Sequence, residues 1–130
     1  MKFSNSFRVA AEDIDAQGHV NNVAYVKWIQ DVAVAHWLSA TTEIEREKYV
    51  WMVTRHEIDY KKQAFENEEV IVKTWVGEPT RISWERFTEI RRGEDLVVKA
   101  RSVWCLIDRE TLKPMRITAE LRELLQINLV

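Results

Sequence analysis

The feature that most constrains the fold is a long helical pattern over residues 23–39. This stretch contains neither glycine nor proline, and few polar side chains, chiefly Lys27, Gln30, Asp31 and His36, interrupt its apolar residues. A helix that is apolar around most of its circumference is surrounded by protein rather than lying on a surface. The sequence therefore predicts a long buried helix, capped at its start by Asn21 or Asn22.

Alternating apolar residues on both sides of this helix indicate strands. We expect strands at residues 6–11, 49–60, 69–76, 82–91 and 96–107, with turns at 78–81 and 92–95. Residues 41–48 are predicted to form a loop or a short helical turn, and a short helix is expected from Thr118 to about Gln126.

The order of these elements predicts an α+β fold. An antiparallel sheet with one apolar face must be covered, and helix 23–39 is the only large cover available. We therefore expect a strongly curved antiparallel sheet wrapped around one long central helix. Such a single layer leaves sheet edges unpaired, which favours pairing with a second copy in a homodimer or homotetramer.

Composition excludes several classes of protein. The 130 residues fit one domain of ordinary size. The 19 basic and 21 acidic residues are mixed, which gives no electrostatic case for nucleic-acid binding. The one cysteine, Cys105, cannot form an internal disulfide and fits a reducing cytoplasm. No apolar run approaches the roughly 18 residues of a membrane span, and no secretory signal is visible.

The run DIDAQGHVNNVAY at residues 13–25 crowds chemically active groups in front of the predicted helix. A carboxylate just ahead of a helix N-terminus lies beside unpaired backbone N–H donors. Acyl transfer needs both parts, a group that attacks or activates water and donors that hold the oxyanion. The alternative interpretation is a solvated loop acid near a helix start.

The same run resembles the signature of hotdog-fold acyl-CoA thioesterases of the 4-hydroxybenzoyl-CoA thioesterase type. It is similar also to the corresponding loop of plant fatty acyl-ACP thioesterases. Weaker similarities lie at residues 25–29, 59–62, 68–70, 80–83, 113–114 and 120–122, so the resemblance covers nearly the whole chain. It implies a single hotdog thioesterase-like domain over residues 1–130.

The resemblance assigns candidate catalytic residues. The family's catalytic carboxylate is the second acid of the Asp-x-Asp pair, which is Asp15, and its oxyanion donor is a backbone N–H at the helix start, near Asn22. A loop histidine implicated in the plant enzymes corresponds to His19. Asp15 can act as nucleophile or as general base on water, and both roles stay open. This chain has Gln17 where the plant enzymes have Asn, and Gln30 where many relatives have an acid.

Further residues are candidates for substrate binding. Gly18 permits a tight turn or a close approach of the backbone to a ligand. Tyr25 is a core or dimer residue that can also line an acyl pocket, and basic side chains suit the phosphates of coenzyme A. Asp13 is interpreted as structural. The substrate-binding candidates are Gly18, Val20, Asn21, Tyr25, Arg55, Lys61, Lys62 and Ser83.

The sequence indicates no metal and no cofactor. No group of His, Cys and acidic residues has metal-ligand spacing, and neither a Gly-rich phosphate loop nor a Gly-x-Ser-x-Gly motif is present. His36 and His56 are interpreted as structural, and Cys105 as buried packing.

These observations predict a cytoplasmic acyl-CoA thioester hydrolase that releases a free acid and coenzyme A. Two alternatives remain, an acyl-ACP thioesterase and a non-catalytic hotdog module that binds acyl-CoA. The sequence does not identify the acyl group.

Overall fold

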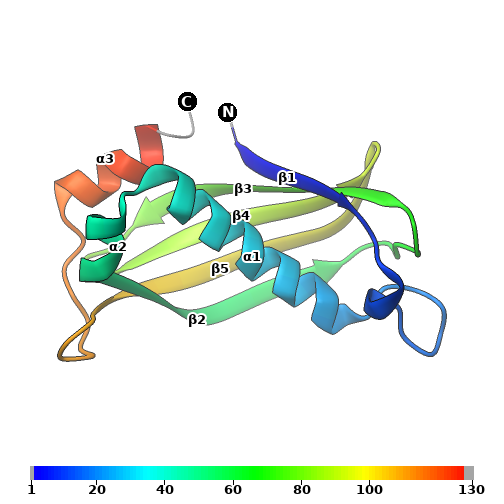
Figure 1. Ribbon diagram of the computed structural model, residues 1–130, viewed down its shortest axis with the longest axis horizontal. Helices are drawn as coiled ribbons and strands as arrows, with labels where there is room; N and C mark the ends of the chain where they lie inside the picture. Colours follow the sequence, from blue (N-terminus) through cyan, green and yellow to red (C-terminus); the bar gives the residue numbers. More distant parts are fainter. Residues whose placement is uncertain (1, 128–130) are drawn as a thin grey trace.

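A five-stranded antiparallel sheet forms the body of the computed structural model, which describes residues 2–127 except the side chain of residue 127 (Figure 1). The strand order is β1-β3-β4-β5-β2, which leaves β1 and β2 at the two edges. All neighbouring strands are antiparallel. The strands are β1 (Phe3–Arg8), β2 (Tyr49–Tyr60), β3 (Glu69–Pro79), β4 (Ser83–Arg92) and β5 (Asp95–Asp108).

The long helix α1 (Asn22–Ala40) runs diagonally across one face of this sheet (Figure 1). Its buried side includes Trp28, Ile29 and Val32, which pack in the core with β-strand residues such as Val72 and Ile90. The other side stays uncovered in a single chain, where Val34 and Leu38 are 47% and 50% exposed. The sheet therefore covers one side of α1, whereas the sequence predicted protein around most of the helix.

Two short helices complete the fold. Residues 41–48, predicted as a loop or helical turn, contain the helix α2 (Glu43–Lys48), which begins with a capping box between Thr42 and Glu45. Helix α3 (Ala119–Ile127) begins after Thr118, whose hydroxyl accepts a hydrogen bond from the backbone of Leu121. A second core cluster joins α3 to the C-terminal end of α1 and to β4 and β5. Its buried members are Ala40, Trp84, Leu106, Ile117, Leu121 and Leu125.

Two predicted boundaries are displaced. The first strand covers Phe3–Arg8 instead of residues 6–11, and Ala11–Asp13 form a single 3-10 turn. Strand β3 continues through Pro79, so the predicted turn at 78–81 lies at residues 80–82. The pairing of β3 with β4 shifts register between Val76 and Pro79. This irregularity accommodates the proline, because Pro79 has no backbone N–H to donate to the neighbouring strand.

No helix among residues 2–127 is long and apolar enough to cross a membrane.

Candidate active site

The loop between β1 and α1 is a narrow hairpin held by its own backbone. The Asn21 N–H donates to the Asp13 carbonyl, and the Asp15 N–H donates to the His19 carbonyl, both at 2.9 Å. Gly18 closes the tip with a φ of +88°, and its N–H donates to the Asp15 carbonyl at 3.1 Å. A positive φ is readily adopted by glycine, which explains the residue at this position. The hairpin holds Asp15 and His19 opposite each other.

The Asp15 carboxylate is partly committed to this loop. Its Oδ1 accepts a hydrogen bond from the Gln17 backbone at 2.9 Å, a turn that an Asp side chain commonly makes. Its Oδ2 accepts no hydrogen bond from the described residues and lies 3.7 Å from Nδ1 of His19. The side chains of His19 and Asp15 are 20% and 23% exposed. One carboxylate oxygen is therefore fixed, and the other is accessible beside an imidazole.

Among the described residues, an unpaired donor lies at the start of α1, the backbone N–H of Asn22. The Asn21 side chain accepts from the Val23 N–H, and the Asn21 carbonyl accepts from the Ala24 N–H, both at 2.9 Å. Of the two caps that the sequence predicted, Asn21 and Asn22, Asn21 is therefore the one in the structure. The Asn22 N–H has no acceptor among residues 2–127. A free N–H at a helix start is an anion-binding group.

Val20 and Tyr25 anchor the loop to the core. The Val20 N–H donates to the Ala64 carbonyl at 2.9 Å, and the Ala64 N–H donates to the Tyr25 hydroxyl at 3.0 Å. Both side chains are buried, and burial raises the pKa of the Tyr25 phenol. These two candidate substrate-binding residues therefore hold the helix start in place, and neither faces an open cleft in a single chain.

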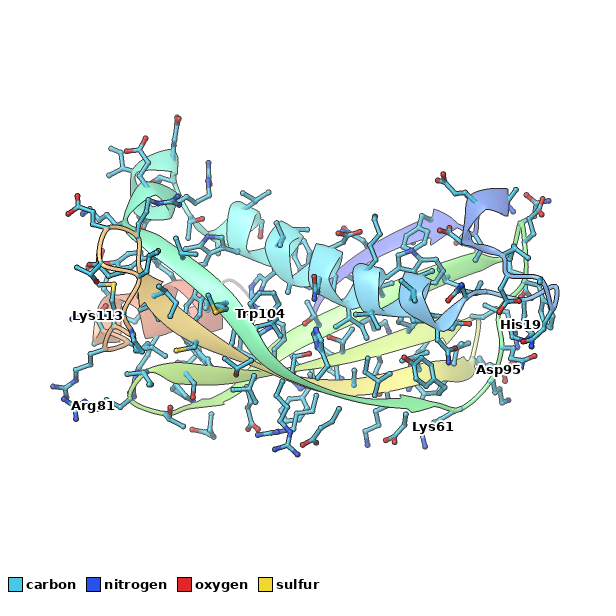
Figure 2. The ribbon with its side chains drawn as sticks, turned by 90° about the horizontal axis from the view of Figure 1, so that it is seen from below. His19, Lys61, Arg81, Asp95, Trp104 and Lys113 are labelled. Atoms are coloured by element: carbon cyan, nitrogen blue, oxygen red, sulfur yellow. The ribbon has the colours of Figure 1, made fainter. Side chains whose placement is uncertain are left out.

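The candidate basic residues are spread over the molecule. Figure 2 shows Lys61 and Asp95 at the end of the molecule that carries His19. Lys62 forms an ion pair with Asp95 at 2.9 Å, and this hydrogen bond, with a second one from Arg92, lowers the pKa of the Asp95 carboxyl. Arg55 lies within β2 and forms an ion pair with Glu57 at 2.8 Å.

Ser83 does not join the other candidates. It begins β4 and shares a hydrogen bond with Thr80, next to Arg81. Figure 2 places Arg81 at the end of the molecule opposite His19. Within a single chain the structure therefore brings together the loop residues, Lys61 and Lys62, and leaves Ser83 at the far end.

The sequence did not predict a cavity of about 330 Å³ at that far end. None of the candidate site residues lines it. Four of the six tryptophans do, Trp37, Trp51, Trp84 and Trp104. Two features of the sequence could have indicated it, the high tryptophan content and the charged Arg86 within a strand. The alternate residues Trp84, Arg86, Thr88 and Ile90 of β4 are buried.

The remaining groups agree with structural roles. His56 lies 2.7 Å from the Ser102 hydroxyl and 3.2 Å from the Gln30 amide nitrogen. Cys105 is buried, and burial raises the pKa of its thiol, which disfavours the reactive thiolate. Among residues 2–127 no three His, Cys, Asp or Glu side chains are grouped to hold a metal ion.

Comparison with known proteins identifies the family. The family described as "Acyl-ACP thioesterase N-terminal domain" has a sequence model that matches residues 1–125. The chain belongs to this family. It is 24% identical over 131 residues to a chloroplastic palmitoyl-acyl carrier protein thioesterase of Gossypium hirsutum, covering 92% of this chain and 32% of that protein. The chain thus spans about a third of the length of the curated relatives it matches.

Solved structures share the fold. A predicted thioesterase from Bacillus stearothermophilus superposes with a TM-score of 0.85 at 22% identity, over 100% of this chain and 98% of that one. A hypothetical protein from Staphylococcus aureus in complex with CoA gives a TM-score of 0.87 at 14% identity, over 98% of this chain and 83% of that one. The hotdog fold and the resemblance to thioesterases are therefore confirmed, and the predicted enzyme class, a thioester hydrolase, agrees with the family.

Proposed function

We propose that the chain hydrolyses acyl-CoA thioesters to a free acid and coenzyme A. The observation that carries this proposal is the pairing, in one loop, of an accessible carboxylate oxygen on Asp15 with the unpaired N–H of Asn22 at the start of α1. Family membership supports the reaction class, and the likeness to a structure that contains CoA supports the carrier.

The proposed reaction uses Asp15 in one of two ways. As a general base, its carboxylate takes a proton from water while the water oxygen attacks the thioester carbonyl, and the CoA thiolate then leaves and takes up a proton. As a nucleophile, it forms a mixed anhydride and expels the CoA thiolate, and water then hydrolyses the anhydride. In both routes the Asn22 N–H stabilises the oxyanion, and His19 orients the carboxylate or contacts the substrate. Single turnover in ¹⁸O-labelled water identifies the nucleophilic route when label enters the Asp15 side chain, which happens if water attacks the Asp15 carbonyl of the anhydride, whereas the general-base route places label in the released acid alone.

We propose that two copies pair through β2. Its outer edge is unpaired in the single chain, and such an edge is a site for pairing with another strand. Tyr60 at one end of β2 packs on Tyr25 at the start of α1, whereas Tyr49 at the other end lines the cavity. Antiparallel pairing of two β2 strands would therefore bring the cavity of one copy toward the loop of the other. Light scattering coupled to gel filtration tests this arrangement, and a monomer at micromolar concentration contradicts it.

A hydrolysis screen tests the function. Short, long and aromatic acyl-CoAs are offered to the purified chain, and released thiol is measured. Turnover of at least one class supports the proposal, and binding without turnover across the panel favours the non-catalytic acyl-CoA-binding module. Because Lys61 and Lys62 lie at the loop end, we expect the KM for acyl-CoA to rise with salt.

The second candidate carrier is acyl carrier protein, which the family description favours. The mixed charge of the chain offers no clear basic face for an acidic carrier. The same acyl group presented on CoA, pantetheine and carrier protein in one assay decides between them. We also place the proposed activity in the cytoplasm, on the strength of the single buried cysteine.

A further inference from the structure

Arg86 is a buried cation without a counter-charge. Its residue is 6% exposed, and its Nη1 donates hydrogen bonds to Nδ1 of His36 at 3.0 Å and to the Thr74 hydroxyl at 3.1 Å. No carboxylate among the described residues lies within 4.0 Å of it. Burial lowers the pKa of Arg86 to about 10, so the guanidinium is still charged at neutral pH. A buried charge without a partner is costly, which makes this position unusual.

Arg86 also has donors to spare. Neither Nε nor Nη2 has an acceptor among residues 2–127. These two nitrogens are not among the fully enclosed polar atoms that lack a partner, so they retain access to open space. Arg86 lies in the wall of the cavity, which provides that space. Two adjacent guanidinium N–H groups are the arrangement that binds a carboxylate through both oxygens.

The rest of the cavity wall suits an apolar molecule. Trp37 and Trp51 meet edge to face with ring centroids 5.9 Å apart, and Trp84 lies 6.4 Å from Trp51. Val34, Val50 and Val76 also line the cavity. A volume of about 330 Å³ is at the lower end of the range for small-molecule sites.

The charges in the wall favour an anion. Arg46 and Arg109 also line the cavity. Arg46 donates to the Thr41 carbonyl at 2.6 Å, and Arg109 donates to the Glu47 carbonyl at 2.8 Å. Neither has a carboxylate partner among the described residues. Among the described residues of the wall Glu85 is the one carboxylate, and its Oε2 lies 2.8 Å from Nε of Arg101. The wall therefore holds three guanidinium groups and one carboxylate, and this carboxylate is already paired with Arg101.

We propose that this cavity binds an apolar carboxylic acid in its anionic form, with the carboxylate on Nε and Nη2 of Arg86 and the apolar body between the tryptophans. The same chemistry has two sources, the acid released by the proposed hydrolysis or an independent carboxylate ligand. Binding itself does not depend on the proposed function, and it can be measured in a chain that hydrolyses nothing.

Tryptophan fluorescence and calorimetry on the whole purified chain test the proposal, because four tryptophans line the site. The probes are decanoate and 2-naphthoate, each compared with the neutral alcohol of the same shape. We expect each acid to bind at least about 10-fold more tightly than its alcohol, since hydrogen bonds to charged groups contribute about 1.5–3 kcal/mol. In Arg86→Gln the affinity for the acids falls about 10- to 100-fold, and the affinity for the alcohols stays unchanged.

Two further variants keep the test decisive. Arg86→Lys retains the charge but loses the planar pair of donors, so it binds the acids with intermediate affinity even if Arg86→Gln does not fold. Arg8→Gln is the matched control, because Arg8 is exposed on β1 and, among the described residues, its side chain donates to the Asn67 carbonyl alone. Equal affinity of acid and alcohol for the native chain, undiminished acid binding in both Arg86 variants, or no binding at millimolar concentration overturns the proposal.

A competition assay identifies the source of the ligand. Competitive inhibition of acyl-CoA hydrolysis by decanoate, weakened in Arg86→Lys, supports the cavity as the site of the released acid. Arg86-dependent binding without inhibition supports an independent ligand. Arg86-dependent binding in a chain without thioesterase activity supports the cavity and contradicts only the proposed function.

Discussion

The two ends of α1 differ in how the chain builds them. At the N-terminal end, a hairpin of consecutive residues presents Asp15, His19 and the Asn22 N–H through backbone hydrogen bonds, and no candidate residue there lines the cavity. At the C-terminal end, side chains from several helices and strands enclose a cavity around the buried Arg86. The proposed reacting groups therefore come from one short loop, whereas residues that are distant in the sequence form the proposed binding cavity.

The largest expected effect is the loss of hydrolysis when Asp15 in the loop is changed. Asp15→Asn keeps the Oδ1 acceptor for Gln17 and removes the charge, so the loop stays folded and kcat falls about 10²- to 10⁴-fold. Asp13→Asn is the matched control, because among the described residues the Asp13 side chain accepts a hydrogen bond from the Ala10 N–H alone, and the change should alter kcat less than about threefold. Steady-state thiol release measures both. Similar rates in the two variants would remove Asp15 from the chemistry.

A pair of glycine substitutions contrasts the two ends in stability. In Gly77→Ala the new Cβ would lie 2.6 Å from Glu85 and 2.7 Å from Phe87, and Glu85 is held by Arg101, so we expect a loss of about 1–3 kcal/mol. In Gly18→Ala nothing lies within 4 Å, and the positive φ alone costs about 1 kcal/mol. Urea unfolding gives both values. A smaller loss for Gly77→Ala than for Gly18→Ala would contradict the tight packing beside Trp84.

His36 should make the cavity end sensitive to acid. Burial, and then the neighbouring Arg86 charge, lower the pKa of His36 to about 4, from an ordinary value of 6.5. Between pH 6.5 and 4, His36 is therefore protonated in the unfolded chain and neutral in the folded chain. The free energy of unfolding has its full value above pH 6.5 and falls by about 2 kcal/mol as the pH drops toward 4. Denaturant unfolding at pH 7 and 4.5 measures the loss, which His36→Asn should reduce. An equal loss in the variant would assign the acid sensitivity to other groups.

The smallest effects concern two helix caps. Asn21→Ala and Thr118→Ala each remove a side-chain acceptor at the start of a helix, so each should cost about 1 kcal/mol. Only Asn21→Ala also disturbs the Asn22 N–H, so only this variant should lower kcat by more than its loss of stability explains. Thiol release at a temperature where both variants are fully folded gives the comparison. Equal kcat values would argue against the helix start as the oxyanion site.

Local patterns in the sequence predicted the loop end well. The helix expected at residues 23–39 is Asn22–Ala40, the strand at residues 49–60 has the predicted bounds, and Asn21 is the cap. These features depend on neighbouring residues. The polar residues 4–6 obscured the start of β1, because an edge strand needs fewer apolar side chains on its exposed face.

The cavity end could not be predicted because its contacts are distant in the sequence. Arg86 meets His36 across 50 positions and Thr74 across 12. Arg86 shares the buried side of β4 with Trp84 and Ile90, and the alternation of the strand gives no sign of whether a carboxylate lies opposite. Likewise, the interpretation of His56 as structural did not identify Ser102 and Gln30 as its neighbours.

A crystal structure with a non-hydrolysable acyl-CoA analogue, in which a ketone replaces the thioester, tests the central claim most directly. We expect the ketone oxygen about 2.7–3.1 Å from the Asn22 nitrogen, the usual geometry of an oxyanion donor. Oδ2 of Asp15 should lie within reach of the carbonyl carbon or of a water molecule beside it. A carbonyl group bound away from the Asp15 loop would contradict the account.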